Sequence, residues 1–267
     1  MNTSKVLPLV IVVLSWISML VAPHRVAHGF ETHPPVLVEL FTSEGCPSCP
    51  PADKLLQKLD GQSIPGQETI VLSEHVDYWN NIGWKDPYSA HFFSERQRAY
   101  AERFGLDDVY TPQMVVDGTS EFVGSDSGLA DKAFRKAAST GKIPVRLSSI
   151  SVDGSHVVHA HLETGLLGTS FGTNAAEIYV AVALNHAETQ VSGGENSGRR
   201  LTHIAVVRSL TKITYLKQGE DFKKDVQLNL ESDSRNLRMI AFIQEPKQGR
   251  ILGGHLYATQ VRRFNPS

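Results

Sequence analysis

The sequence predicts an α/β domain followed by an antiparallel, β-sandwich-like C-terminal domain. An apolar run at Val36–Phe41 leads through a Cys-x-x-Cys motif into a helical pattern at Ala52–Leu59, which is a strand-to-helix unit. After residues 142–144, Lys-Ile-Pro, the pattern changes to short strands separated by turn residues. We therefore expect three parts: a signal peptide at 1–29, the α/β domain at 30–142 and the β-rich domain at 143–267.

The N-terminus has the pattern of a secretory signal peptide. Lys5 precedes an apolar run from Val6 to Ala22, and the small residues around His28 suit a cleavage site. The run is long for a signal and near the lower limit for spanning a bilayer, so an uncleaved anchor is the alternative. In either case we expect an exported, periplasmic or extracellular protein, which touches a membrane only if the segment stays uncleaved.

Charge is balanced along the chain, with 26 Lys and Arg residues against 28 Asp and Glu residues. The sequence has no long basic run, no interleaved aromatic and basic pattern and no acidic tail. Binding to nucleic acids or other polyanions is therefore poorly supported, and we expect no nucleic-acid partner.

Cys46 and Cys49 are the only two cysteines in 267 residues. As a structural staple they would contribute only about 2 kcal/mol, because the loop that they close is short. As part of a zinc site they would need two more ligands, and the sequence after the predicted signal peptide has no second Cys-x-x-Cys and no His-x-x-x-His pair. The motif favours a redox-active pair, with the staple and the metal site as alternatives.

The prolines after the motif locate the cysteines relative to the helix. Pro50 and Pro51 fit only the first turn of a helix, so Cys46 lies ahead of it. The free N–H groups and the dipole of the helix favour a thiolate there, and the thiolate is the nucleophile. Cys46 would attack a substrate disulfide, and Cys49, further in and more buried, would resolve the mixed disulfide.

A strand, the sequence Cys-Pro-Ser-Cys and a helix resemble the active-site signature of the thioredoxin superfamily. That fold places a cis-proline opposite the thiols, and the stretch VYTPQMVVDG, Val109–Gly118, is similar to this element. The resemblance implies a thioredoxin-like α/β domain, a cis bond between Thr111 and Pro112 beside the Cys46 sulfur, and a strand at Gln113–Val116. An ordinary trans proline is the alternative.

The stretch between these two elements supplies further candidates. Ile70–Val76 is typical of the next parallel strand, and Tyr88–Phe104 is typical of a helix. Because neighbouring parallel strands end at the same edge of a sheet, we expect His75, Asp77, Tyr78 and Trp79 to lie near Cys46.

Four stretches together resemble the secreted thioredoxin-like proteins of domain of unknown function family 1223: ELFTSEGCPSCPPAD, HVDYWNNIGWKDPYS, VYTPQMVVDG and GENSGRRLTHIAVVR. The resemblance spans about Pro35 to Leu256. It implies a β-rich C-terminal extension and supplies no activity. Ile204 stands where a polar or acidic residue is expected after His203, which weakens the case for a polar role of the last stretch.

Several residues could tune the chemistry of the pair. Glu44 could raise the thiol pKa or move the proton of the second cysteine, or it could be a solvated turn residue. His75 could stabilise the thiolate or relay a proton, or be a satisfied histidine at a strand end. Asp77 is an alternative proton carrier. Trp79 and Trp84 could line a peptide groove or pack in the core.

The β-rich part offers two weaker candidates after a predicted helix at Gly128–Thr140. His159 and His161 alternate with apolar residues and share one face, so they could bind a metal, but a solvated face is the alternative because no convincing third ligand is present. The glycine-rich stretch Ser192–His203 could be a mobile loop, or a lid or docking loop beside the thiols.

We expect an exported protein similar to thiol–disulfide oxidoreductases, with protein or small thiol and disulfide substrates. Thr111 and Pro112 would shape the groove that holds the substrate. No organic cofactor is needed, because the cysteine pair carries the electrons. One alternative is a Cu(I) chaperone that uses Cys46, Cys49 and His75 as ligands. The other is a non-catalytic binding module with an inert disulfide. The sequence does not identify a redox partner.

Overall fold

The computed structural model describes residues 35–61, 68–153, 156–230 and 236–258. The helices are α1 (Pro50–Gly61), α2 (His91–Phe104), α3 (Ser127–Ala138) and the short 3-10 helix η1 (Thr169–Phe171). The strands are β1 (Val36–Thr42), β2 (Thr69–His75), β3 (Gln113–Val116), β4 (Ser120–Val123), β5 (Val145–Val152), β6 (Val157–Thr164), β7 (Ala175–Gln190), β8 (Arg200–Lys217), β9 (Phe222–Asn229), β10 (Leu237–Gln244) and β11 (Ile251–Ala258). The predicted signal segment lies outside the described residues, and none of the helices within them is long and apolar enough to cross a membrane.

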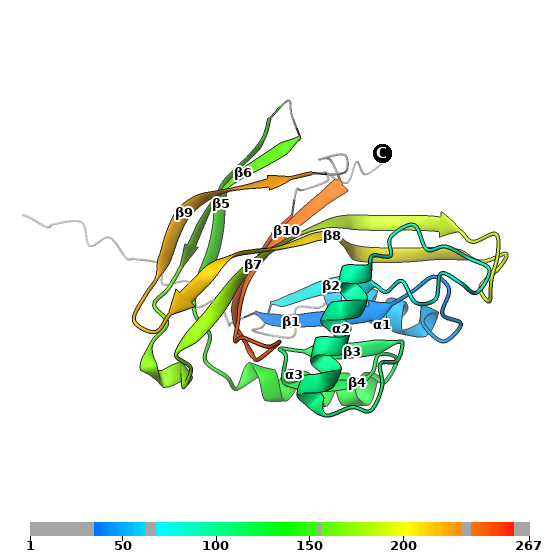
Figure 1. Ribbon diagram of the computed structural model, residues 1–267, viewed down its shortest axis with the longest axis horizontal. Helices are drawn as coiled ribbons and strands as arrows, with labels where there is room; N and C mark the ends of the chain where they lie inside the picture. The colour runs from blue at the N-terminus through cyan, green and yellow to red at the C-terminus, as the bar shows by residue number, and fades with distance from the viewer. Residues whose placement is uncertain (1–34, 62–67, 154–155, 231–235, 259–267) are drawn as a thin grey trace, which may run out of the picture. The chain divides into compact units, whose positions relative to one another are not determined.

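The prediction of an α/β thioredoxin-like domain followed by a separate β-sandwich-like domain is wrong. One mixed eight-stranded sheet runs through both parts of the chain in the order β11-β10-β7-β8-β2-β1-β3-β4, and β5, β6 and β9 form a second sheet (Figure 1). The described residues hold eleven strands and three α-helices, so the fold is mostly β. A parallel pairing of β8 with β2, at Ser73 and Val206, joins the two parts.

The physical reason lies in β2 and β8. Every residue of β2 is buried, and a buried strand needs hydrogen-bonding partners along both edges. β1 pairs with one edge of β2 in parallel, and β8 lies along the other. β8 has 18 residues, which is long enough to pair with β7 and still to reach β2. Its middle residues, Ala205, Val206 and Val207, are fully buried, as expected for a central strand.

Local elements lie close to their predicted positions. Pro50 and Pro51 stand in the first turn of α1, and β3 occupies Gln113–Val116, as predicted. The helix α2 begins at His91 instead of the predicted Tyr88. The Asp86 side chain accepts the backbone N–H of Tyr88, so this segment forms a turn before the helix begins.

Alternate residues of the central strands face different helices. Val38 and Leu40 of β1 pack with residues of α1 and α3 on one face. Leu37 and Phe41 pack with residues of α2 on the other face. A third cluster around Leu162 joins the smaller sheet to β7 and β10. The place of a residue along β1 or β2 therefore decides which helix its side chain meets.

Candidate functional site

Cys46 and Cys49 form a disulfide in the turn between β1 and α1. The backbone N–H of Cys46 donates to Ser43 O, and that of Cys49 donates to Cys46 O. The N–H groups of Ala52 and Asp53 donate to Cys49 O, so the disulfide directly precedes the first turn of α1, as predicted. Neither cysteine has exposed surface, so the prediction that Cys49 is the more buried of the two is wrong.

The Thr111–Pro112 peptide bond is cis, as predicted. Ser48 Oγ lies 3.4 Å from Thr111 O and 3.4 Å from Cys46 Sγ, so one exposed serine joins the proline turn to the disulfide. Trp79 Nε1 donates to Thr111 Oγ1 at 2.8 Å. The structure therefore brings Trp79 and the proline turn beside the cysteine motif.

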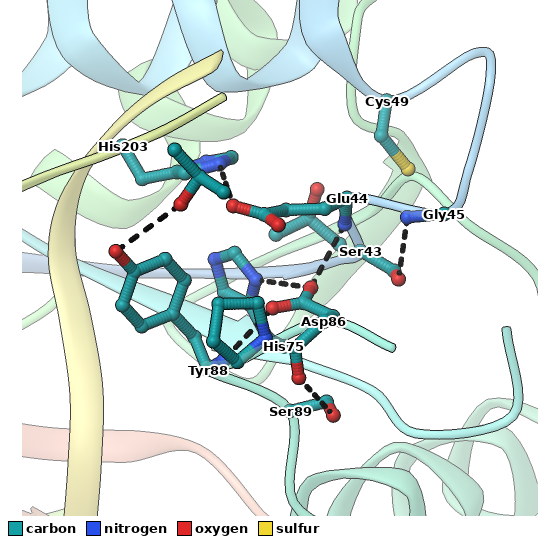
Figure 2. A network of polar contacts seen from close by, with 12 residues as sticks. Ser43, Glu44, Gly45, Cys49, His75, Asp86, Tyr88, Ser89 and His203 are labelled. Atoms are coloured by element: carbon teal, nitrogen blue, oxygen red, sulfur yellow. Dashed lines mark hydrogen bonds and ion pairs between the residues drawn. The ribbon is translucent and has the colours of Figure 1, made fainter. Parts of the chain in front are cut away.

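Glu44 is fully buried, so its interpretation as a solvated turn residue is wrong. Its Oε2 accepts a hydrogen bond from Trp84 Nε1 at 2.8 Å, and its backbone N–H donates to Asp86 Oδ2 at 2.8 Å. Its Oε1 has no hydrogen-bond partner among the residues that the structure describes and lies 3.4 Å from His203 Nε2. Figure 2 shows the Glu44 side chain extending from the side of Cys49 towards the His203 ring.

His203, on β8, lies between two carboxylates. Its Nε2 is 3.4 Å from Glu44 Oε1, and its Nδ1 is 3.7 Å from Asp53 Oδ2. Thr42 Oγ1 donates to the other Asp53 oxygen at 3.0 Å. Burial lowers the pKa of His203, but the neighbouring Asp53 and Glu44 carboxylates raise it by a larger amount, to about 10. The two nearby carboxylates therefore favour the cationic form of the ring. Sequence reasoning missed this residue.

His75 belongs to the same buried network. Its ring meets that of His203 edge to face, with 4.7 Å between the ring centroids, and its Nδ1 lies 2.7 Å from Asp86 Oδ2 (Figure 2). Burial raises the pKa of Asp86, but His75 and the backbone N–H groups of Glu44 and Tyr88 lower it to about 2. Among the described residues, His75 Nε2 has no hydrogen-bond partner, so the ring is bonded through Nδ1 alone.

The Asp77 side chain contacts the start of α2. Its Oδ1 accepts a hydrogen bond from Ser94 Oγ at 2.6 Å, and its Oδ2 lies 3.0 Å from His91 Nδ1. Both partners lie in the first turn of α2, so Asp77 anchors the start of that helix. The carboxylate that reaches His75 is that of Asp86, from the loop after β2.

The loop between β7 and β8 covers the turn that holds the disulfide. Asn196 is fully buried, and its Nδ2 donates to Glu44 O at 2.8 Å and to Cys46 O at 2.9 Å. Gly194 has a φ of +66°, and a Cβ atom there would lie 2.8 Å from Ile82 O, which only glycine avoids. The predicted glycine-rich stretch therefore lies beside the cysteine pair.

Within the described ranges, no group of three or more His, Cys, Asp or Glu side chains is arranged to hold a metal ion. His159 and His161 face carboxylates instead. His159 Nε2 lies 3.0 Å from Asp153 Oδ2, and His161 Nδ1 lies 2.6 Å from Asp225 Oδ1. The two histidines are partly exposed on the smaller sheet.

The family model described as protein of unknown function (DUF1223) matches residues 37–244. Among solved structures, the chain is similar to the crystal structure of a protein from Agrobacterium tumefaciens, with 24% identity, a TM-score of 0.66 and coverage of 87% of this chain and 97% of that chain. It is also similar to HBP35 of Porphyromonas gingivalis, with 15% identity, a TM-score of 0.63 and coverage of 88% and 81%. At these identities the two structures support the fold alone. No curated protein matches the chain.

Proposed function

Because the chain belongs to the DUF1223 family, whose description assigns no activity, we propose its function from its own residues. The Cys46–Cys49 pair exchanges disulfides with protein or small thiol and disulfide substrates. The observation that carries this proposal is the contact between the disulfide turn and a buried network of ionisable side chains. A staple across so short a loop contributes about 2 kcal/mol and requires no such network.

The reaction has two steps. In the reduced protein, the Cys46 thiolate attacks one sulfur of a substrate disulfide, forms a mixed disulfide and releases the other substrate sulfur as a thiolate. The Cys49 thiol then loses its proton to water, and the resulting thiolate attacks the Cys46 sulfur. This attack restores the protein disulfide and releases the second substrate thiolate. The substrate gains the two electrons that the cysteine pair loses, and the reverse sequence oxidises a dithiol.

The surroundings of the pair support these roles. Cys46 stands ahead of the N-terminus of α1, where the helix dipole stabilises a thiolate. Pro47 and Ser48 between the cysteines are exposed, which gives a substrate an approach next to Thr111 and Trp79. Because both cysteines are buried, the β7–β8 loop has to withdraw before a substrate sulfur can reach them.

We place the reaction outside the cytoplasm. The pattern of residues 1–29 is that of an export signal. A disulfide persists in oxidising, exported compartments and is rare where glutathione and thioredoxin keep thiols reduced. Both arguments favour a periplasmic or extracellular site of action.

Covalent trapping tests the proposal. The Cys49→Ser variant should accumulate mixed disulfides with exported proteins, because the resolving step is lost, and the Cys46→Ser variant should accumulate none. Diagonal gels of acid-quenched exported extracts would display the adducts. If Cys49→Ser carries no more adducts than Cys46→Ser, the proposal is wrong. A staple predicts equal, small losses of stability in both variants, and a Cu(I) site predicts that both lose copper affinity.

A further inference from the structure

The side chain of Gln97, on α2, is fully buried and hydrogen-bonded through both ends of its amide. Its Nε2 donates to Tyr110 O at 2.7 Å and to Gln113 Oε1 at 3.0 Å. Its Oε1 accepts a hydrogen bond from Tyr78 OH at 3.2 Å. The amide nitrogen has two N–H donors, and both are used. One helical side chain therefore ties together the segment after β2, the segment before Pro112 and the strand β3.

The partners of Gln97 are held by further hydrogen bonds. Gln113 Nε2 donates to Glu121 Oε2 at 3.1 Å, and Tyr110 OH donates to the same oxygen at 2.6 Å. The network thus runs from α2 through β3 to β4 and holds Tyr110 through both its carbonyl and its hydroxyl group. Tyr110 begins the proline turn, Tyr110–Pro112, so the network fixes one end of that turn.

The proline turn lies beside the disulfide. Ser48 Oγ is 3.4 Å from Thr111 O and 3.4 Å from Cys46 Sγ. The hydrogen bond to Thr111 O is therefore long and weak, and Ser48 is exposed. A main-chain N–H of a substrate can replace the serine hydroxyl at this carbonyl. Main-chain hydrogen bonds of this kind bind extended peptides, and one formed here would bring a sulfur of the same peptide close to Cys46.

We infer that the substrates of the disulfide are polypeptides that bind along the proline turn, and that Gln97 is the positioning residue that holds this turn in place. This inference rests on the proposed function and narrows its substrates to proteins. Gln97 acts through Tyr110 O, and within the described residues it has no hydrogen bond to the cysteine turn. Loss of its amide should therefore weaken the binding of a peptide without changing the reactivity of Cys46.

Two probes with the same coloured leaving group separate binding from reactivity in the reduced full chain. The first is Ellman's reagent, which has no peptide main chain. The second is a short peptide of alanine and serine whose single central cysteine forms a mixed disulfide with thionitrobenzoate. Attack by the Cys46 thiolate releases thionitrobenzoate from either probe, so stopped-flow absorbance measures both rates.

In Gln97→Met the peptide concentration that gives half the maximal rate should rise roughly tenfold, because the lost hydrogen bonds leave the proline turn free to shift. The maximal rate with the peptide and the rate with Ellman's reagent should be unchanged. Gln57→Met is the matched control, since Gln57 Nε2 also donates to a backbone carbonyl at 2.7 Å, that of Thr202 on β8. Its rates with both probes should equal those of the wild type.

Equal effects of Gln97→Met on both probes, or no effect on either, would overturn the inference and leave the proposed function standing. A reduced wild type that reacts with neither probe would reject the proposed function itself. If Gln97→Met does not fold, Tyr78→Phe decides, because it removes only the hydrogen bond to Gln97 Oε1. It should raise the half-saturating peptide concentration about threefold at an unchanged rate with Ellman's reagent, and an unchanged half-saturating concentration would overturn the inference.

Discussion

On the face of the sheet that α2 covers, the buried charged side chains are joined by short hydrogen bonds. Arg96 Nε donates to Glu39 Oε1 at 2.7 Å, and Arg96 Nη2 donates to Gln244 Oε1 at 3.0 Å. Tyr100 OH donates to Glu39 and accepts from Gln244 Nε2. The four side chains form a ring in which each one bonds to the next. Glu74 stands beside this ring, 3.6 Å from Arg96 Nε.

On the face that α1 covers, the buried charges are held more loosely. His203 lies 3.4 and 3.7 Å from its two carboxylates, and within the described part of the chain neither ring nitrogen has a hydrogen bond. Glu74 and His75 are consecutive in β2 and yet belong to different networks, because successive residues of a strand point to opposite faces. The comparison separates two uses of buried charge. A closed ring fixes each side chain through hydrogen bonds, whereas His203 is held by the charge of two carboxylates at longer distances.

The largest expected effect follows from opening the closed ring. Arg96→Met should lower the free energy of unfolding by roughly 3–5 kcal/mol, because it leaves the buried Glu39 carboxylate without its cation. The rate at which the reduced protein exchanges disulfides with Ellman's reagent should be unchanged, because Arg96 lies on the opposite face of the sheet from the disulfide network. Denaturant unfolding at neutral pH measures the first quantity.

The matched control for this variant removes both charges. Glu39→Gln combined with Arg96→Met should recover a large part of the lost stability, since no buried charge then remains unpaired in that ring. A slower exchange with Ellman's reagent in Arg96→Met, at a temperature where the variant is folded, would show that the two faces are coupled and would break the comparison.

The second prediction concerns the segments that cover the two networks, a helix in one case and a loop in the other. The ring lies under a helix, whereas the disulfide lies under a loop that Asn196 holds with two hydrogen bonds. Asn196→Ala should speed reduction of the disulfide by dithiothreitol roughly tenfold or more, because each lost bond contributes about 1 kcal/mol to the closed loop. The exposed neighbour Glu195→Ala is the control. Equal reduction rates in all three proteins would mean that reductants reach the sulfurs without movement of this loop.

Elements with local signals were predictable from the sequence. An apolar run, two prolines and leucines at helical spacing place β1, the cysteine turn and α1 correctly. The resemblance to known proteins added the cis bond at Pro112. The parallel pairing of β8 with β2 has no connecting turn to indicate it, since the partners Ser73 and Val206 are far apart in the chain. The available signal was the continuous apolar run at Ala205–Val207, which is typical of a central strand.

The same missed pairing hid His203 from sequence reasoning. Ile204 argued against a polar role for its stretch, but Leu201, His203 and Ala205 are buried while the residues between them are only partly buried. Alternation along β8 therefore separates His203 from Ile204. Asp77 follows β2 directly and is bound by Ser94 and His91 of α2, and the carboxylate that contacts His75 is that of Asp86.

The smallest expected effect concerns Glu74, which lies beside the ring without completing it. Burial and the neighbouring Glu39 carboxylate raise the pKa of Glu74 well above its ordinary value of 4.5, although Arg96 lowers it. The folded protein therefore holds a proton that the unfolded chain releases. The stability that this proton contributes is fully present below pH 4.5 and declines as the pH rises towards the folded pKa.

Glu74→Gln keeps the shape of the protonated side chain and cannot ionise, so it should escape this decline. Relative to wild type, its free energy of unfolding should increase by about 1 kcal/mol between roughly pH 4 and 5.5, because only the wild-type unfolded chain gives up a proton there. Unfolding curves of both proteins across that range measure the difference, and titrating groups that they share cancel. The rate of exchange with Ellman's reagent should not change. A constant difference with pH would mean that Glu74 is ionised in the folded protein, so that the α2 face holds two carboxylates against one guanidinium and is not the closed, charge-matched network that the comparison requires.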